Sequence, residues 1–109
     1  DKEKRERMGR VAARLADWTI LTSDNPRSEE PGDIIAAIEK GFEKEAVKTY
    51  EVEPDRRKAI VLALATANKG DIVLIAGKGH EDYQIFKDRT VHFSDIEVVE
   101  ETLRAMEAV

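Results

Sequence analysis

The chain has 109 residues and a mass of 12.3 kDa, which fits one domain with a single core. No apolar run approaches the roughly 18 residues that a membrane helix needs, and the lack of cysteine excludes disulfides and thiolate metal sites. A net charge of −5 argues against generic nucleic-acid binding through phosphates. The chain opens on Asp1 within the charged run DKEKRER, so we expect a fragment of a longer protein.

Helical and extended patterns alternate along the chain. Residues 3–16 are predicted to form a helix with a core stripe of Met8, Val11, Ala12 and Leu15. Apolar residues 18–22 predict a strand, and residues 47–52 predict a weaker one. Further helices are predicted over residues 31–42 and 54–68. The capping box SDIE at 94–97 starts a last helix, whose expected core positions are Ile96, Val99, Leu103 and Met106.

The run IVLIA at residues 72–76 predicts a strand buried on both faces, because it is continuously apolar between two glycines. Residues 83–86 and 90–93 predict a β-hairpin. Together the elements predict an α/β domain with a mainly parallel central sheet and the C-terminal hairpin on one edge. Ligands of such sheets bind beyond the carboxyl ends of the strands. We therefore expect a site in the polar loops 23–30 and 77–82.

The first of these loops contains Asp24, Asn25, Pro26 and Arg27. The proline stiffens the loop, and the Arg27 guanidinium is a planar fork of donors suited to a carboxylate or phosphate. Asn25 can both donate and accept, and Asp24 can hold the arginine or receive an ammonium. The residues alone leave open a plain Asx-type turn with a solvated arginine.

The second loop is the glycine-rich segment GKGHED at residues 77–82. Gly77 allows a close approach of a ligand to the backbone, Glu81 can pair with an ammonium, and Lys78 can pair with an anion. The segment lacks the spacing of a nucleotide phosphate loop, and the run of His, Glu and Asp at 80–82 is a poor metal site because adjacent side chains rarely face one ion. A tight turn before the hairpin stays open as the alternative.

Taken in order, LTSDNPRSEEP and VLIAGKGHEDYQ strongly resemble the Mur ligase family, and the resemblance spans essentially the whole chain. It implies that residues 1–109 are the C-terminal, amino-acid-binding domain, with a Rossmann-like three-layer fold. The activity implied is that of a cytoplasmic, ATP- and Mg²⁺-dependent amide ligase of peptidoglycan synthesis. Such a ligase adds meso-diaminopimelate to UDP-N-acetylmuramoyl-L-alanyl-D-glutamate and has no nucleic-acid or membrane partner.

The resemblance also implies roles for single residues. Asp24, Asn25, Pro26 and Arg27 match the family's diaminopimelate-recognition motif, in which Arg27 grips the distal carboxylate and Asn25 helps to orient it. In the glycine loop, the Gly77 backbone and the Glu81 carboxylate receive the distal ammonium. Lysine lacks the distal carboxylate, so Arg27 favours diaminopimelate over lysine.

The family's N-terminal domain and central ATPase domain have no counterpart in the sequence. The phosphate loop, magnesium ligands and modified catalytic lysine belong to that central domain, so we expect no catalytic or metal-binding residue here and no activity from the chain alone. Two alternatives remain. One is a self-contained, non-catalytic module that binds an amino acid or nucleotide, and the other is a lysine-adding ligase, against which Arg27 argues.

Overall fold

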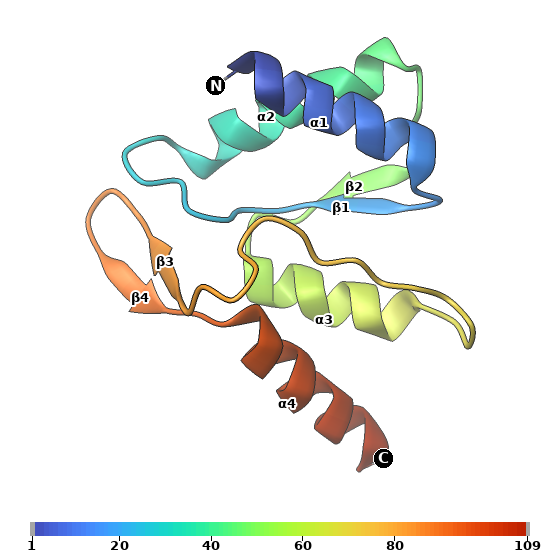
Figure 1. Cartoon of the computed structure of the whole chain (residues 1–109), viewed down its shortest axis with the longest axis vertical. Helices are drawn as coiled ribbons and strands as arrows, with labels where there is room; N and C mark the ends of the chain where they lie inside the picture. Colours follow the sequence, from blue (N-terminus) through green and yellow to red (C-terminus); the bar gives the residue numbers. More distant parts are fainter. Residues whose placement is uncertain (1, 109) are drawn as a thin grey trace.

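The computed structural model describes residues 2–108 and confirms the α/β class. Strands β1 and β2 lie between the helices α1 and α2 on one side and α3 on the other, the β3–β4 hairpin lies at the left of the view, and α4 extends beyond α3 (Figure 1). Strand β1 pairs in parallel with β2, and β3 pairs antiparallel with β4. No described helix is long and apolar enough to cross a membrane. In chain order the elements are α1 (Lys2–Leu15), β1 (Thr19–Leu21), α2 (Pro31–Lys44), β2 (Tyr50–Val52), α3 (Arg56–Thr66), β3 (Tyr83–Ile85), β4 (Thr90–His92) and α4 (Asp95–Glu107).

Helices α1 and α2 cross at two buried glycines. A Cβ atom on Gly9 would collide with the Ile38 carbonyl, and one on Gly41 would collide with the backbone of α1. The two backbones can therefore approach each other only where side chains are missing. Below this crossing, the fully buried Phe42 packs with its ring centroid 4.5 Å from that of Tyr50. The pair anchors α2 to β2.

Polar contacts at the surface also join α2 to α1 and to β2. Arg10 and Arg14 of α1 both donate to the carboxylate of Glu45 at the end of α2, at 2.9–3.0 Å. These hydrogen bonds, led by that of Arg14, lower the pKa of Glu45 to about 2. On the other side of α2, the Tyr50 hydroxyl donates to Glu39 at 2.7 Å, and this hydrogen bond raises the pKa of Tyr50 to about 12.

The core stripe predicted for the first helix is wrong in part. Met8, Val11 and Leu15 are exposed, whereas Ala13 and Gly9 are buried against α2. The smallest residues of α1 face its neighbour because the close crossing selects for missing side chains rather than for apolar bulk. Of the predicted stripe only Ala12 packs against the core, and the three larger residues face solvent.

The buried strand predicted at residues 72–76 is not observed. This segment is extended but pairs with no strand among the described residues, so the described strands form two separate sheets rather than one. Its side chains alternate: Ile75 packs against the core of α3 and α4, while Ile72 is 93% exposed and Leu74 is 86% exposed. The prediction of burial on both faces is wrong because only one face of the segment is covered.

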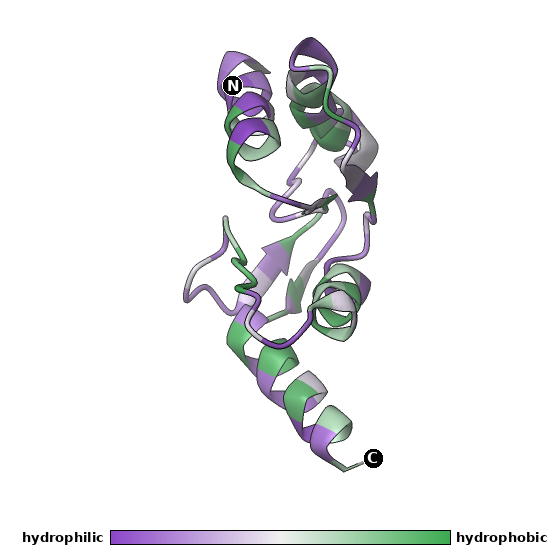
Figure 2. Cartoon of the chain, turned by 90° about the vertical axis from the view of Figure 1, so that its right-hand side faces the viewer, coloured by the Kyte–Doolittle hydropathy of each residue, from purple (hydrophilic) through white to green (hydrophobic). Residues whose placement is uncertain are grey.

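The second core joins α3 and α4 through Ile60, Phe93 and Val98. The predicted capping of α4 is confirmed, since the Ser94 hydroxyl accepts from the Glu97 amide at 3.3 Å. Its predicted core face is wrong in part. Val99 packs against this core, but Ile96 is exposed although it lies in the first turn. Leu103 and Met106 are exposed because the later turns extend beyond α3, so hydrophobic residues recur along α4 to its C-terminal end (Figure 2).

Candidate functional site

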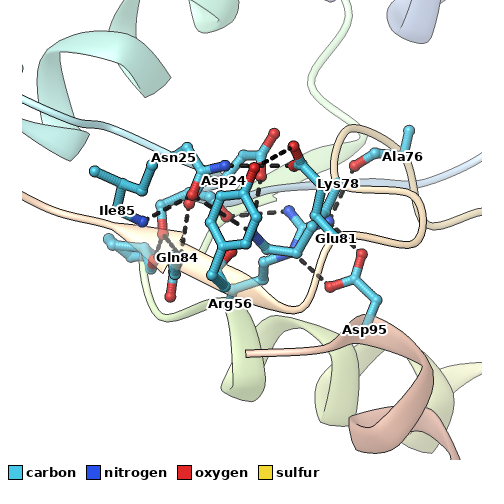
Figure 3. A network of polar contacts seen from close by, with 12 residues as sticks. Asp24, Asn25, Arg56, Ala76, Lys78, Glu81, Gln84, Ile85 and Asp95 are labelled. Carbon is cyan, nitrogen blue, oxygen red and sulfur yellow. Dashed lines mark hydrogen bonds and ion pairs between the residues drawn. The ribbon is translucent and has the colours of Figure 1, made fainter. Parts of the chain in front are cut away.

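The two polar loops lie against each other in the structure, although they are about fifty residues apart in the sequence (Figure 3). The side-chain amide Nδ2 of Asn25 donates to Glu81 Oε1 at 3.4 Å. The first loop follows β1, and the second follows the extended segment 72–76 and leads into β3. Their expected proximity is therefore confirmed, even though the sheet that was to bring them together is incomplete.

Strand β3 holds the first loop in place through four hydrogen bonds. Gln84 Nε2 donates to Ser23 Oγ at 3.2 Å and to the Asp24 carbonyl at 2.9 Å, and the Ile85 amide donates to Asn25 Oδ1 at 2.8 Å. The Arg27 amide in turn donates to the Ile85 carbonyl at 2.9 Å. The loop thus lies along the hairpin like an additional edge, and backbone and side-chain groups of the protein itself hold its residues without a ligand.

Arg27 occupies an unusual backbone conformation. Its φ is +57°, in the left-handed region that non-glycine residues rarely adopt. Such strain costs roughly 1 kcal/mol and persists only where the surroundings impose it, here the preceding proline and the hydrogen bond to Ile85. The side chain is exposed, and its guanidinium has no ion-pair or hydrogen-bond partner between residues 2 and 108. A free guanidinium on a rigid loop can receive an external anion.

Glu81 presents its carboxylate beside this loop. Its two oxygens accept from Asn25 and from the Tyr83 hydroxyl, the latter at 3.0 Å. The hydrogen bond to Glu81 raises the pKa of Tyr83, and the positive charge of Arg27 opposes that rise to a smaller extent. Arg27 and Glu81 therefore act on the same tyrosine from the two loops. A carboxylate has about four acceptor positions, so Glu81 can still receive an ammonium.

The structure gives Asp24 and Lys78 partners that the sequence did not predict. Lys78 is buried, and its Nζ lies 3.3 Å from Asp24 Oδ1. Asp24 thus pairs with the lysine rather than with Arg27, and Lys78 is not accessible to an external anion. Gly77 has a φ of +110°, and a Cβ there would lie 3.2 Å from Asp24 Oδ2. Glycine is required at this position both by the backbone and by the neighbouring carboxylate.

Arg56 supports both loops from below and was missed by the sequence analysis. Its guanidinium forms a bidentate pair with Asp95 at 2.7 and 2.8 Å, and it also donates to the carbonyls of Ser23 and Ala76 at 3.0 and 3.1 Å (Figure 3). Ser23 is the first residue of the first loop, and Ala76 immediately precedes the second. The only local signal was an arginine in the first turn of a helix, which is ordinarily a solvated residue.

In the part of the chain that the structure describes, no group of three or more His, Asp or Glu side chains converges. The site instead offers one free cation and one carboxylate on a rigid frame. Such a pair is suited to a ligand that carries an anionic and a cationic group close together.

Comparison with known proteins identifies the family of the chain. The family model described as "Mur ligase, glutamate ligase domain" matches residues 1–79. The chain belongs to the Mur ligase family. Residues beyond 79 include the hairpin and α4, so the family model covers Asp24 to Gly77 but not Glu81.

Curated relatives extend the likeness over nearly the whole chain. It is 53% identical over 103 residues to a protein of Prochlorococcus marinus (strain NATL1A) named UDP-N-acetylmuramoyl-L-alanyl-D-glutamate--2,6-diaminopimelate ligase, and these residues are 94% of this chain and 20% of that protein. A protein of the same name from Caldanaerobacter subterraneus subsp. tengcongensis is 52% identical over 107 residues, which are 98% of this chain and 22% of that protein. The chain therefore spans about a fifth of the length of these relatives.

A solved structure titled as the same ligase superposes with a TM-score of 0.89 at 39% identity, over 98% of this chain and 22% of that one. Since 98% of this chain matches 22% of a longer ligase, the comparison does not favour the alternative of a self-contained binding module.

Proposed function

We propose that the chain is the amino-acid-binding domain of an ATP-dependent, cytoplasmic ligase that adds meso-diaminopimelate to UDP-N-acetylmuramoyl-L-alanyl-D-glutamate. The observation that carries the proposal is that an unpaired guanidinium, Arg27, and a carboxylate, Glu81, lie on two loops that contact each other. The Asn25–Glu81 contact joins these loops at 3.4 Å, in a chain about half identical to relatives named for that reaction.

The site residues then divide the work on the distal, zwitterionic centre of diaminopimelate. Arg27 binds its carboxylate in a bidentate manner, and Glu81, with the backbone of Gly77, binds its ammonium. Asn25 orients the ligand between them, while Asp24 and Pro26 hold the loop. Because the ligand's other amine stays free, it can attack a phosphorylated D-glutamate carboxylate, form the amide bond and release phosphate.

ATP and Mg²⁺ do not fit the residues described here. The glycine loop lacks the phosphate-loop spacing, and no cluster of metal ligands forms within residues 2–108. We assign both groups, the nucleotide-sugar peptide and the catalytic residues to ligase domains beyond this sequence. This domain then recognises the incoming amino acid and closes over the reaction site, and the chain alone is inactive.

The finer fold is also a proposal. We propose that residues 72–76 complete a single Rossmann-like sheet between the helix layers in solution. Support comes from their extended backbone and from Ile75, which packs against the core of α3 and α4 as a residue on the inner face of such a sheet would. Hydrogen exchange tests this. Amides of 72–76 should exchange as slowly as those of β1, and exchange as fast as in the loop 68–70 would refute it.

An amide-resolved NMR titration of the chain tests the function. With meso-diaminopimelate at millimolar concentration, we expect shifts confined to residues 23–28 and 77–83. L-lysine should produce much weaker shifts, and Arg27→Ala should abolish those caused by diaminopimelate. Equal responses to the two amino acids would refute Arg27 as the selective group.

The full-length ligase provides the kinetic test. Loss of a charge-assisted bidentate contact is worth about 2–4 kcal/mol, so Arg27→Ala should lower kcat/KM for diaminopimelate roughly 30- to 1000-fold. The KM for ATP should hardly change. An enzyme that used diaminopimelate equally well without Arg27 would refute the assignment of this residue.

A further inference from the structure

Lys78 is the most deeply buried charged side chain at the site. Its side chain is 0% exposed, although it lies in a glycine-rich loop whose neighbouring residues are exposed. An ammonium has three donors, and Nζ has three oxygens around it. It donates to the Tyr83 carbonyl and, at 3.5 Å, to Asn25 Oδ1, and it lies 3.3 Å from Asp24 Oδ1. Burial of a charge on this scale is costly unless such partners are present.

These contacts decide which way the Asn25 amide faces. Oδ1 receives two donors, the Ile85 amide at 2.8 Å and Lys78. If the amide were flipped, its NH₂ group would face both donors and its oxygen would face the Glu81 carboxylate. The flipped state would lose every hydrogen bond of the side chain. Lys78 therefore helps to keep Nδ2 directed at Glu81, where the 3.4 Å contact joins the loops.

The same ammonium also holds the other side of the first loop. Asp24 pairs with Lys78 through Oδ1, which leaves Oδ2 against Gly77 (Figure 3). A single cation from the second loop thus fixes two adjacent side chains of the first. Arg27 lies two residues beyond Asn25, after the stiff Pro26, so its position depends on how these residues are held.

We propose that Lys78 is a positioning residue for amino-acid recognition, which acts by orienting the Asn25 amide and the Asp24 carboxylate rather than by touching the ligand. This rests on the proposed function, since it concerns the same site. Lys78 connects the cation-binding half of the site, at Glu81, to the anion-binding half, at Arg27. Its loss should weaken binding of diaminopimelate specifically, while other substrates bind as before.

Kinetics of the full-length ligase test the proposal with Lys78→Met, which keeps the length of the side chain and removes its charge. Lys69→Met is the matched control, because Lys69 lies exposed in a turn remote from the site. Hydrogen bonds to charged groups imply that Lys78→Met raises the KM for diaminopimelate roughly 10- to 150-fold. The KM for ATP should be unchanged, and Lys69→Met should match the wild type.

The outcomes separate the two proposals. If the wild-type ligase does not use diaminopimelate, the proposed function fails. If the wild type uses it and Lys78→Met uses it equally well, only the role of Lys78 fails. A rise in KM that is equal for diaminopimelate and ATP would also overturn this role, because it would indicate general damage to the fold.

A measurement on the wild-type chain keeps the proposal falsifiable if Lys78→Met does not fold. In ¹⁵N NMR, the ammonium of Lys78 should exchange its protons with water much more slowly than that of Lys69. The Asn25 side-chain amide should also shift when diaminopimelate is added. An ammonium of Lys78 that exchanged as fast as that of Lys69, or an Asn25 amide that did not respond to the amino acid, would overturn the proposal.

Discussion

Replacement of Arg56 by methionine should destabilise the domain more than any surface charge change. The Arg56 side chain is 3% exposed, and the side chain of its partner Asp95 is 8% exposed. Removing the guanidinium leaves the Asp95 carboxylate buried without its counter-charge, and leaves the carbonyls of Ser23 and Ala76 without a donor. Breaking a buried ion pair in this way costs about 3–5 kcal/mol.

That loss is a large fraction of the stability of a domain of this size, which is typically about 5–15 kcal/mol. For about 100 residues, each kcal/mol shifts Tm by roughly 4–8 °C, so Arg56→Met should lower Tm by more than about 12 °C. Urea denaturation followed by far-UV circular dichroism gives the free energy of unfolding directly. An unchanged slope against urea would show that the variant still unfolds from a compact native state.

The chain offers a matched control in the next residue. Arg57 also forms an ion pair, with Glu101, but these side chains are 55% and 58% exposed. Exposed pairs contribute about 0–1 kcal/mol, so Arg57→Met should be nearly neutral. Combining Arg56→Met with Asp95→Asn should cost less than the sum of the two single changes, because the double variant leaves no unpaired charge. Equal losses for Arg56→Met and Arg57→Met, or simple additivity in the double variant, would refute this reasoning.

Three further predictions test other parts of the fold. Gly9→Ala should destabilise the chain by about 1–3 kcal/mol in urea denaturation, because its methyl group would collide with α2, whereas Gly32→Ala, with no atom within 4 Å, should stabilise it by about 0.4–1 kcal/mol. The folded state lowers the pKa of Glu45 from 4.5 to about 2. The ionised carboxylate therefore contributes fully to the free energy of unfolding above pH 4.5, and this contribution is lost as the pH falls toward 2. In urea denaturation at several pH values, Glu45→Gln should make the fall in stability across that range shallower. Gly77→Ala should lower kcat/KM for diaminopimelate in the full-length ligase more than Gly79→Ala. At Gly77 φ is +110° and an added Cβ would press on the Asp24 carboxylate, whereas at Gly79 φ is +61° and the space around it is open. Equal kinetic losses in the two variants would contradict this.

Local signals in the sequence predicted where most elements begin, because capping is decided within a few residues. Ser94 caps α4 as expected, and the hairpin turns where predicted, closed by a hydrogen bond from the Phe86 amide to the Arg89 carbonyl. Which face of a helix is buried depends on its neighbours. Apolar periodicity could not reveal that α1 buries the face that carries Gly9. That contact depends on the lack of a side chain on both helices, which a pattern of apolar residues does not record.

In the candidate site, too, the sequence predicted local features but not contacts between distant residues. Asp24, Asn25 and Glu81 were accessible to sequence reasoning because they lie in short loops whose residue types suit a charged ligand. The supporting cations were not, because Arg56 and Lys78 are neutralised by Asp95 and Asp24, which lie 39 and 54 residues away in the sequence. Nothing in the local pattern distinguishes a buried charged residue from a solvated one until its partner is placed.

The charge balance of the site explains why a zwitterionic centre would fit it better than a lone ammonium. The two buried cations beneath the loops are already neutralised by aspartates, at 2.7 and 3.3 Å. What remains for a ligand is Arg27 and Glu81, one charge of each sign. Under the proposed function, diaminopimelate satisfies both, whereas lysine satisfies Glu81 and leaves the guanidinium to be desolvated on closure without an anion. A site built around a paired charge discriminates strongly against a ligand that leaves it unpaired. Selectivity would therefore come less from the strength of the arginine contact than from the penalty for closing over an arginine without one.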